Sequence, residues 1–596
     1  MMASSSKCYP KRRTVSSRIA LADSDLPPQT SLHWQGLPHE PQDRIVNNVS
    51  ELITALKGDI ARGIDSTLVA KWSCITGYCE ALSTHKDQSR RYRIFPIPVE
   101  AIARMVQKEF IDWIRKIGAT KVTQGHREVA RIISNEVWNN VISKASVRDE
   151  LHANSVYVCL RGTIDKKALD CFGASLATIV GLNIAGFTSY LTLSEDHAYE
   201  SHLKGNENQG RPGMKYATCE VAIPGKNKAS QQKRGREISE SFSSNAKNAP
   251  IITPQTSWLY MAEEAVVCNI PMTIAAIFGN INCQIEKTKS KSISSRCLYE
   301  IKRELMWTLY DMGILANFPF ALSELGECEE NVPSPRGMEW IAMKQLDGEE
   351  ILMNEKLFIE SVISSRTKYG DSQVYPYCYA GHYHKDAGRE STMEEYRLVE
   401  AMRLYYHAAR VASGYLYDLS CLQLVKTITK VTQLMAEDIF AADTNCESAR
   451  DSKLKPRCWA RRDNSIAFGT WFLGFFDACL LWEEKGEGTG KQFVEVLNPL
   501  HKFFLGKLFL TMDLSVRQEI MRLIYTEGEQ INQNDFLLES VTEKKLNFFT
   551  TPKSKRLTPD GILAIALAKE KLSIGELEIA LPTPVGGRKR RRHAMT

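Results

Sequence analysis

The sequence lacks the spacings that would assign its cysteines to a metal or a redox motif. It holds 15 cysteines, yet no two of them form a CxxC pair, which excludes a zinc ribbon and a thioredoxin-type motif. The count is odd and the cysteines are scattered over 596 residues, whereas disulfide frameworks belong mainly to short secreted domains. We therefore expect an intracellular protein whose thiols are reduced and mostly buried.

Targeting and membrane segments are also missing. Residues 1–31 are basic and rich in Ser and Pro but contain no apolar core, so we expect no signal peptide. The longest uncharged stretch, Ala174 to Leu193, contains Asn183 and two glycines. This composition favours a buried helix followed by a strand over a membrane span.

No strong charge of one sign is present. The chain has 76 Lys and Arg against 70 Asp and Glu, a balance that does not by itself indicate a nucleic-acid-binding protein. The Gly-rich segment 486–491 is not a phosphate-binding loop, because Lys485 stands in place of the first glycine and Gln492 in place of Ser or Thr. The chain is 43% hydrophobic, so most of it can bury a core.

Hydrophobic periodicity predicts a mainly α fold with an α+β insert. Apolar residues recur at helical spacing in Val99 to Gly118 and in His126 to Ala145. Asp170 is suited to cap a helix over about 171–182, and β-rich segments follow at 189–193 and 215–223. The segment from Leu309 to Leu322 has the Leu-Tyr-x-x-Gly, aromatic, Ala-Leu pattern of tetratricopeptide-like helix pairs.

The pattern alone predicts a mainly helical part over 45–150 and an α+β part over about 150–262. With the family resemblance given below, six segments are predicted. They are a disordered N-terminus (1–45), a helical N-terminal domain (46–120), an α+β domain (121–265), a tetratricopeptide-like helical domain (266–440), a helical C-terminal domain (441–545) and a largely disordered basic tail (546–596). The tail ends in five consecutive basic residues, Arg588, Lys589, Arg590, Arg591 and Arg592. We interpret them as a nuclear localisation signal, with weak DNA contact as the alternative.

One group of residues suggests catalysis. Cys171 stands near a predicted helix N-terminus, where the helix dipole favours a thiolate; His197 follows in a strand context and Glu220 on another strand. This order is similar to that of transglutaminase-like and papain-like thiol enzymes. The alternative, a buried cysteine and a core histidine, is the simpler one in a chain with 15 Cys and 12 His.

Aromatic residues concentrate in a few places. Val374 to Tyr379 holds three tyrosines, and Phe318 and Phe320 flank a proline. Such residues are usually core, although Tyr is also enriched in binding pockets.

Several strings in one order resemble the menin family of nuclear scaffold proteins. They are Leu193 to Ala198, Ser257 to Tyr260, Leu305 to Gly313, Phe318 to Leu322, Val374 to Tyr379 and Val411 to Tyr417. The resemblance covers about 45–530 and the tail segment Ile562 to Leu581. It implies a helical N-terminal domain, a transglutaminase-like thumb, a tetratricopeptide-like palm and helical fingers.

The resemblance also implies a function. Members of the family have no known catalysis, and they bind short peptides, anchored by Phe and Pro, in a deep pocket between thumb and palm. The implied partners are mixed-lineage-leukaemia-type histone H3 lysine 4 methyltransferases, a Jun-family transcription factor and a chromatin-associated co-activator. A nuclear protein that is also present in the cytoplasm is expected, with no cofactor or metal and no membrane partner.

Position by position, the resemblance assigns fourteen residues to the peptide-binding pocket. They are Asp196, His197, Ala276, Gly279, Asn282, Phe318, Phe320, Glu324, Tyr375, Cys378, Tyr379, Tyr405, Gln423 and Thr427. Small residues at Ala276 and Gly279 predict a wider pocket floor. Neutral residues at Gln423 and Thr427 predict weaker attraction for basic peptides, and Glu324 is expected to restore some negative charge at the edge.

Overall fold

The structure is a computed structural model. It describes residues 44–83, 94–119, 125–137, 170–195, 197–203, 216–221, 264–283, 293–342, 350–388, 394–414, 426–436 and 462–485, with six single positions between 497 and 508. These residues are mostly helical and include one four-stranded sheet and one two-stranded sheet, in agreement with the predicted fold class. Among them, no helix combines the length and the apolar character that crossing a membrane requires.

The N-terminal part is a layer of helices. They are α1 (Val49–Arg62), α2 (Ser66–Ser83), α3 (Val99–Met105), the π-helix η2 (Val106–Ile111), α4 (Asp112–Ala119) and α5 (His126–Val137). The helix predicted over 99–118 is present, but a π-helical turn interrupts it. Asn48 caps α1 by accepting a 3.0 Å hydrogen bond from the Glu51 amide, which satisfies one of the free donors at the helix start.

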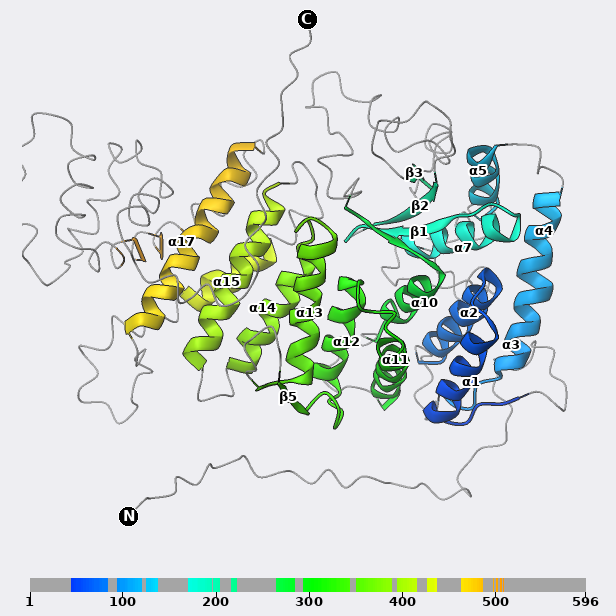
Figure 1. Cartoon of the computed structure of the whole chain (residues 1–596), viewed down its shortest axis with the longest axis horizontal. Coiled ribbons are helices and arrows are strands. Elements are labelled where there is room, and N and C mark those ends of the chain that lie inside the picture. Colours follow the sequence, from blue (N-terminus) through cyan, green and yellow to red (C-terminus); the bar gives the residue numbers. More distant parts are fainter. Residues whose placement is uncertain are drawn as a thin grey trace, which may run out of the picture.

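A helix and a four-stranded antiparallel sheet follow. They are α7 (Cys171–Ile184), β1 (Tyr190–Leu193), β2 (Ala198–Leu203), β3 (Tyr216–Cys219) and β4 (Val266–Cys268), and the strand order is β3-β2-β1-β4. Asp170 caps α7 as predicted, because its carboxylate accepts the Gly173 amide at 2.9 Å. The uncharged stretch from residue 174 is therefore a buried helix followed by a strand. Figure 1 shows α7 beside this sheet, above α2 and α10.

The remaining helices stand side by side in a row (Figure 1). They are α10 (Ile270–Gly279), α11 (Ile293–Asp311), α12 (Pro319–Asn331), α13 (Met353–Lys368), α14 (Tyr375–Gly388), α15 (Glu394–Ala412) and α17 (Arg462–Lys485). Residues 426–436 are also helical. A short hairpin, β5 (Trp340–Ala342) with β6 (Glu350–Leu352), precedes α13. The sequence predicted helices alone after residue 262, whereas the structure also has the strands β4, β5 and β6. Runs of three residues are too short to be recognised as strands from the sequence.

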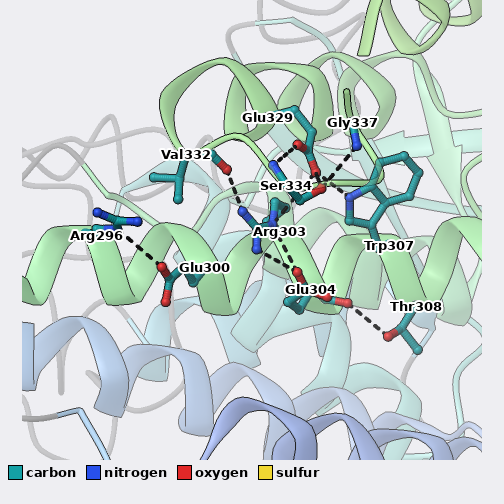
Figure 2. Close-up of polar contacts among 10 residues, drawn as sticks. All are labelled: Arg296, Glu300, Arg303, Glu304, Trp307, Thr308, Glu329, Val332, Ser334 and Gly337. Atoms are coloured by element: carbon teal, nitrogen blue, oxygen red, sulfur yellow. Dashed lines mark hydrogen bonds and ion pairs between the residues drawn. The ribbon is translucent and has the colours of Figure 1, made fainter. Parts of the chain in front are cut away.

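A buried carboxylate holds α11 and α12 together, as Figure 2 shows. Glu329 accepts hydrogen bonds from the Trp307 indole at 2.6 Å and from the Ser334 amide at 2.8 Å. Arg303 lies 3.8 Å from the same carboxylate. The predicted turn at Gly313 is present with φ 73°, a conformation that glycine adopts without strain. The turn at Gly313 and the contacts of Glu329 therefore hold the predicted helix pair together.

The apolar core forms two clusters that meet in α13. One extends from Val46 to Leu357 and joins the N-terminal helices, the sheet and α10 to α12. The other extends from Phe358 to Leu508 and joins α13, α14, α15 and α17. The string Ser257 to Tyr260, the terminus before residue 44 and the basic tail lie outside the described residues.

Candidate functional site

A cavity of about 780 Å³ lies between the sheet and the row of helices. Its walls come from the N-terminus of α7, the turn between β1 and β2, the end of α10, and parts of α11, α12 and α14. A cavity of this size suits a small molecule or a few side chains of a peptide. The chain therefore places one site where its α+β part meets its helical part.

Glu195 in the turn between β1 and β2 joins the two sides of the cavity. Its carboxylate accepts the amide of Val374 at 2.6 Å and the amide of Tyr375 at 2.5 Å. Amides at the start of a helix have no acceptor within the helix, so Glu195 supplies one, and its negative charge also interacts favourably with the helix dipole. Pro376 follows in the first turn, a position that tolerates proline because its missing N–H would have no helical partner.

Two tyrosines on α14 form an aromatic wall. Tyr375 and Tyr379 are four residues apart, so they share one face of the helix, and their ring centroids are 6.2 Å apart. The Tyr379 hydroxyl donates to a Glu324 oxygen at 3.3 Å. The nearby Glu324 charge, together with burial, raises the pKa of Tyr379 well above its usual value, which keeps it a neutral phenol.

A buried ion pair lies beside this wall. The Lys302 ammonium on α11 donates to Glu324 on α12 at 2.5 Å and to the Ile281 carbonyl at 3.4 Å. Burial alone would lower the pKa of Lys302, but the Glu324 carboxylate outweighs it, so that the pKa lies well above its usual value. Glu324 therefore does not add the uncompensated negative charge expected at the pocket edge, because Lys302 neutralises it.

Phe320 occupies the space that the small residue Gly279 leaves. A Cβ atom at Gly279 would lie 2.8 Å from Phe320 Cε1, closer than real side chains approach. The ring of Phe318 lies next to it, 5.8 Å away between centroids. The expected widening of the floor at Gly279 is therefore wrong, because an aromatic ring fills it.

Cys171, His197 and Glu220 come together at the other wall. His197 Nε2 lies 2.9 Å from a Glu220 oxygen, and the Cys171 side chain is in hydrogen-bond contact with His197. Burial lowers the pKa of His197, but the Glu220 charge and the Cys171 contact outweigh it and raise the pKa to about 10. His197 is therefore protonated at neutral pH, and Cys171 lies at the N-terminus of α7 as predicted.

The structure brings eight of the fourteen predicted pocket residues to this cavity. They are His197, Gly279, Asn282, Phe318, Phe320, Glu324, Tyr375 and Tyr379. Asp196 and Gln423 lie outside the described residues. Thr427 is exposed on the helix 426–436 and does not line the cavity. The neutral rim predicted from Gln423 and Thr427 is therefore not part of the described cavity lining.

Three other predicted residues are buried elsewhere. Ala276 is packed inside α10, and Cys378 faces the second core cluster, since it lies about one hundred degrees around α14 from Tyr379. The Tyr405 hydroxyl bonds to His382 Nδ1 at 2.6 Å, which holds the tyrosine between α14 and α15. These three assignments are corrected: the residues support the cavity wall without lining it.

Sequence reasoning missed four charged residues of the cavity. Asp170 and Glu195 belong to the α+β side, and Lys302 and Glu327 to the helical side. Nothing in the local sequence distinguishes these residues from solvated charges. Lys302, for example, stands among Glu300, Arg303 and Glu304 on α11, and only the packing of α12 against it supplies the partner that a buried lysine requires.

Comparison with known proteins adds two findings. The protein-family model described as Menin matches residues 65–534. A crystal structure of menin, described as revealing the binding site for the Mixed Lineage Leukemia (MLL) protein, matches with a TM-score of 0.56 and 21% sequence identity. The match covers 81% of this chain and 97% of that one.

Proposed function

The chain belongs to the menin family, and from this premise we propose that it is a scaffold that binds short linear peptides in the cavity described above. The observation that carries the proposal is the cavity lining, in which Tyr375, Tyr379 and Phe320 present apolar ring surface beside hydroxyl and carboxylate groups. Such a wall buries an aromatic or proline side chain and still offers hydrogen bonds to the peptide backbone. This is the chemistry that a Phe- and Pro-anchored peptide requires.

The charge of the lining favours a basic peptide. Because Lys302 neutralises Glu324, three carboxylates, those of Asp170, Glu195 and Glu327, remain in the described lining against protonated His197. A net negative lining attracts a ligand that carries Arg or Lys next to its apolar anchor.

The family supplies the broader role that we propose. The α+β part would act as the thumb, α10 to α15 as the tetratricopeptide-like palm, and the later helices as the fingers. The partners would be mixed-lineage-leukaemia-type histone methyltransferases, a Jun-family transcription factor and a chromatin-associated co-activator, in the nucleus. The basic tail would serve nuclear import, with weak DNA contact as its alternative use.

Binding of a designed peptide tests the proposal. We expect a short, fluorescently labelled peptide with one Phe, one Pro and flanking Arg to bind the full chain, measured by fluorescence anisotropy. Changing the Phe to Ala should weaken binding at least about tenfold, because an aromatic anchor buried in a pocket is a typical hot spot. Equal affinity of the two peptides would contradict an aromatic-lined site.

A second candidate function rests on the contact of Cys171 with His197 and Glu220. Glu220 accepts from Nε2, so Nδ1 is the ring nitrogen that remains for the thiol. In such an arrangement the thiolate attacks the carbonyl carbon of a side-chain carboxamide, and ammonia leaves with a proton from His197. Water then hydrolyses the thioester and restores the thiol. Family membership favours the scaffold, and the triad geometry favours this chemistry as an additional activity.

Alkylation rates test the second candidate. We expect iodoacetamide to modify Cys171 at least about tenfold faster than Cys297 at neutral pH, because reactive cysteines lie beside an imidazolium and at a helix N-terminus, as Cys171 does. Cys297 is a matched control: it is also partly exposed, and burial raises the pKa of its thiol to about 11. His197→Ala should slow the Cys171 reaction alone. Similar rates at the two cysteines would exclude an activated nucleophile.

A further inference from the structure

A second group of chemically active side chains lies outside the cavity lining. His126 is the first residue of α5, and Glu200 and His202 lie on β2. Residues two apart on a strand point to the same side, so Glu200 and His202 both face the start of α5. The cavity uses none of the three.

The donor atoms of these residues converge. His126 Nε2 lies 2.9 Å from Glu200 Oε1, and His202 Nδ1 lies 3.3 Å from both Glu200 oxygens. The two imidazole rings are stacked, with 3.8 Å between centroids. All three residues offer a ligand atom within 4.8 Å of the others.

Two of these spacings are close to the edges of a tetrahedral metal site. Zinc bonds to histidine nitrogen and carboxylate oxygen are about 2.0–2.2 Å long, which places neighbouring ligand atoms about 3.3 Å apart. The two histidine–glutamate spacings are 2.9 and 3.3 Å, and an ion between the three donors requires the stacked rings to turn towards each other. Three protein ligands would leave the fourth position to water or an exogenous ligand.

The three side chains differ in exposure. Glu200 is fully buried, while the side chains of His126 and His202 are 17% and 19% exposed, which leaves an approach from solvent.

Further contacts orient the carboxylate. The Ser189 hydroxyl donates to Glu200 Oε1, and Cys219, directly opposite on β3, also contacts Glu200. Such outer contacts fix a ligand and are typical of metal sites. Arg127 is a nearby cation, and it interacts with the Cys219 side chain.

We propose that His126, Glu200 and His202 form a binding site for a divalent transition-metal ion, with zinc as the ion that best fits two imidazoles and one carboxylate. The site departs from the expectation, drawn from the sequence, that the protein has no metal. Because His126 begins α5 and the other two ligands lie on β2, the ion would tie this helix to the sheet. A hydrogen-bonded network without metal is the competing explanation.

Metal titration of the full chain distinguishes the two explanations. Chelator-treated protein should bind one Zn²⁺ at this site by isothermal titration calorimetry, and Co²⁺ should give the visible absorption of a tetrahedral site. His202→Ala should weaken binding at least about tenfold and remove the Co²⁺ spectrum. The control His382→Ala, on α14, should leave both unchanged.

Thermal unfolding supplies a readout that does not depend on the spectrum. Zn²⁺ should raise the unfolding temperature of the wild type and not that of His202→Ala, since a ligand bound only to the folded state stabilises it. If His126→Ala fails to fold, His202→Ala still tests the metal site, because the side chain of His202 lies at the partly exposed edge of the site. No Zn²⁺ binding would overturn the proposal. So would binding that survives His202→Ala and is lost in Cys171→Ser.

Discussion

Replacing Lys302 with Met should lower the free energy of unfolding of this chain by about 3–5 kcal/mol. Lys302 and Glu324 are both nearly fully buried and are joined at 2.5 Å, so the substitution leaves a carboxylate without its cation in a low-dielectric environment. The remaining hydrogen bond from Tyr379 is long, at 3.3 Å, and cannot replace it. The measurement is the shift of the urea unfolding midpoint, followed by circular dichroism.

Lys356→Met is the matched control. Lys356 also pairs with a glutamate, Glu360 at 3.4 Å, but both side chains are about a quarter exposed, so the loss should stay under about 1 kcal/mol. The double variant Lys302→Met, Glu324→Leu should recover much of the lost stability, because it removes the unpaired charge as well. Equal shifts for the two single variants would show that the pair in the cavity wall is solvated.

Replacing Tyr375 and Tyr379 together with Ala should weaken binding of the Phe- and Pro-containing peptide by about a hundredfold, or about 2.8 kcal/mol. The two rings form one wall of the cavity, and their removal takes away both the apolar contact surface and the hydroxyls. Fluorescence anisotropy with the labelled peptide measures the change.

The matched control for the wall is a tyrosine outside the cavity. Tyr396 on α15 is 47% exposed and does not line the cavity, so Tyr396→Ala should bind like the wild type. Circular dichroism of the double variant separates a binding effect from unfolding. Unchanged affinity in a folded double variant would refute the assignment of the peptide to this cavity.

The sequence predicted those parts of the fold that depend on local pattern. The helix capped by Asp170 and the pair of helices around Gly313 both carry their signals within a few residues. The π-helical turn at 106–111 carries none, because the apolar spacing there is that of an ordinary helix. Strands as short as β4 cannot be recognised, since three residues do not establish an alternation.

The site was predictable where side chains share one element and not where elements meet. The spacing of Tyr375 and Tyr379 on a helix predicts that they share one face. Their role in the pocket came from the resemblance to the menin family. Lys302 on α11 pairs with Glu324 on α12. Phe320, also on α12, fills the space beside Gly279 on α10. Tyr405 was misplaced for the same reason: its direction depends on how α15 packs against His382 of α14.

The bridge made by Glu195 has a consequence for how the chain folds. Its carboxylate bonds to the amide of Val374, 179 residues further along the chain. Contacts of such high sequence separation form late, because the entropy of closing the intervening loop must be overcome first. The N-terminal half can therefore emerge and fold during synthesis before the cavity is complete, and a chain that stops before α14 would keep the walls from α7, α10, α11 and α12 but lack the tyrosine wall.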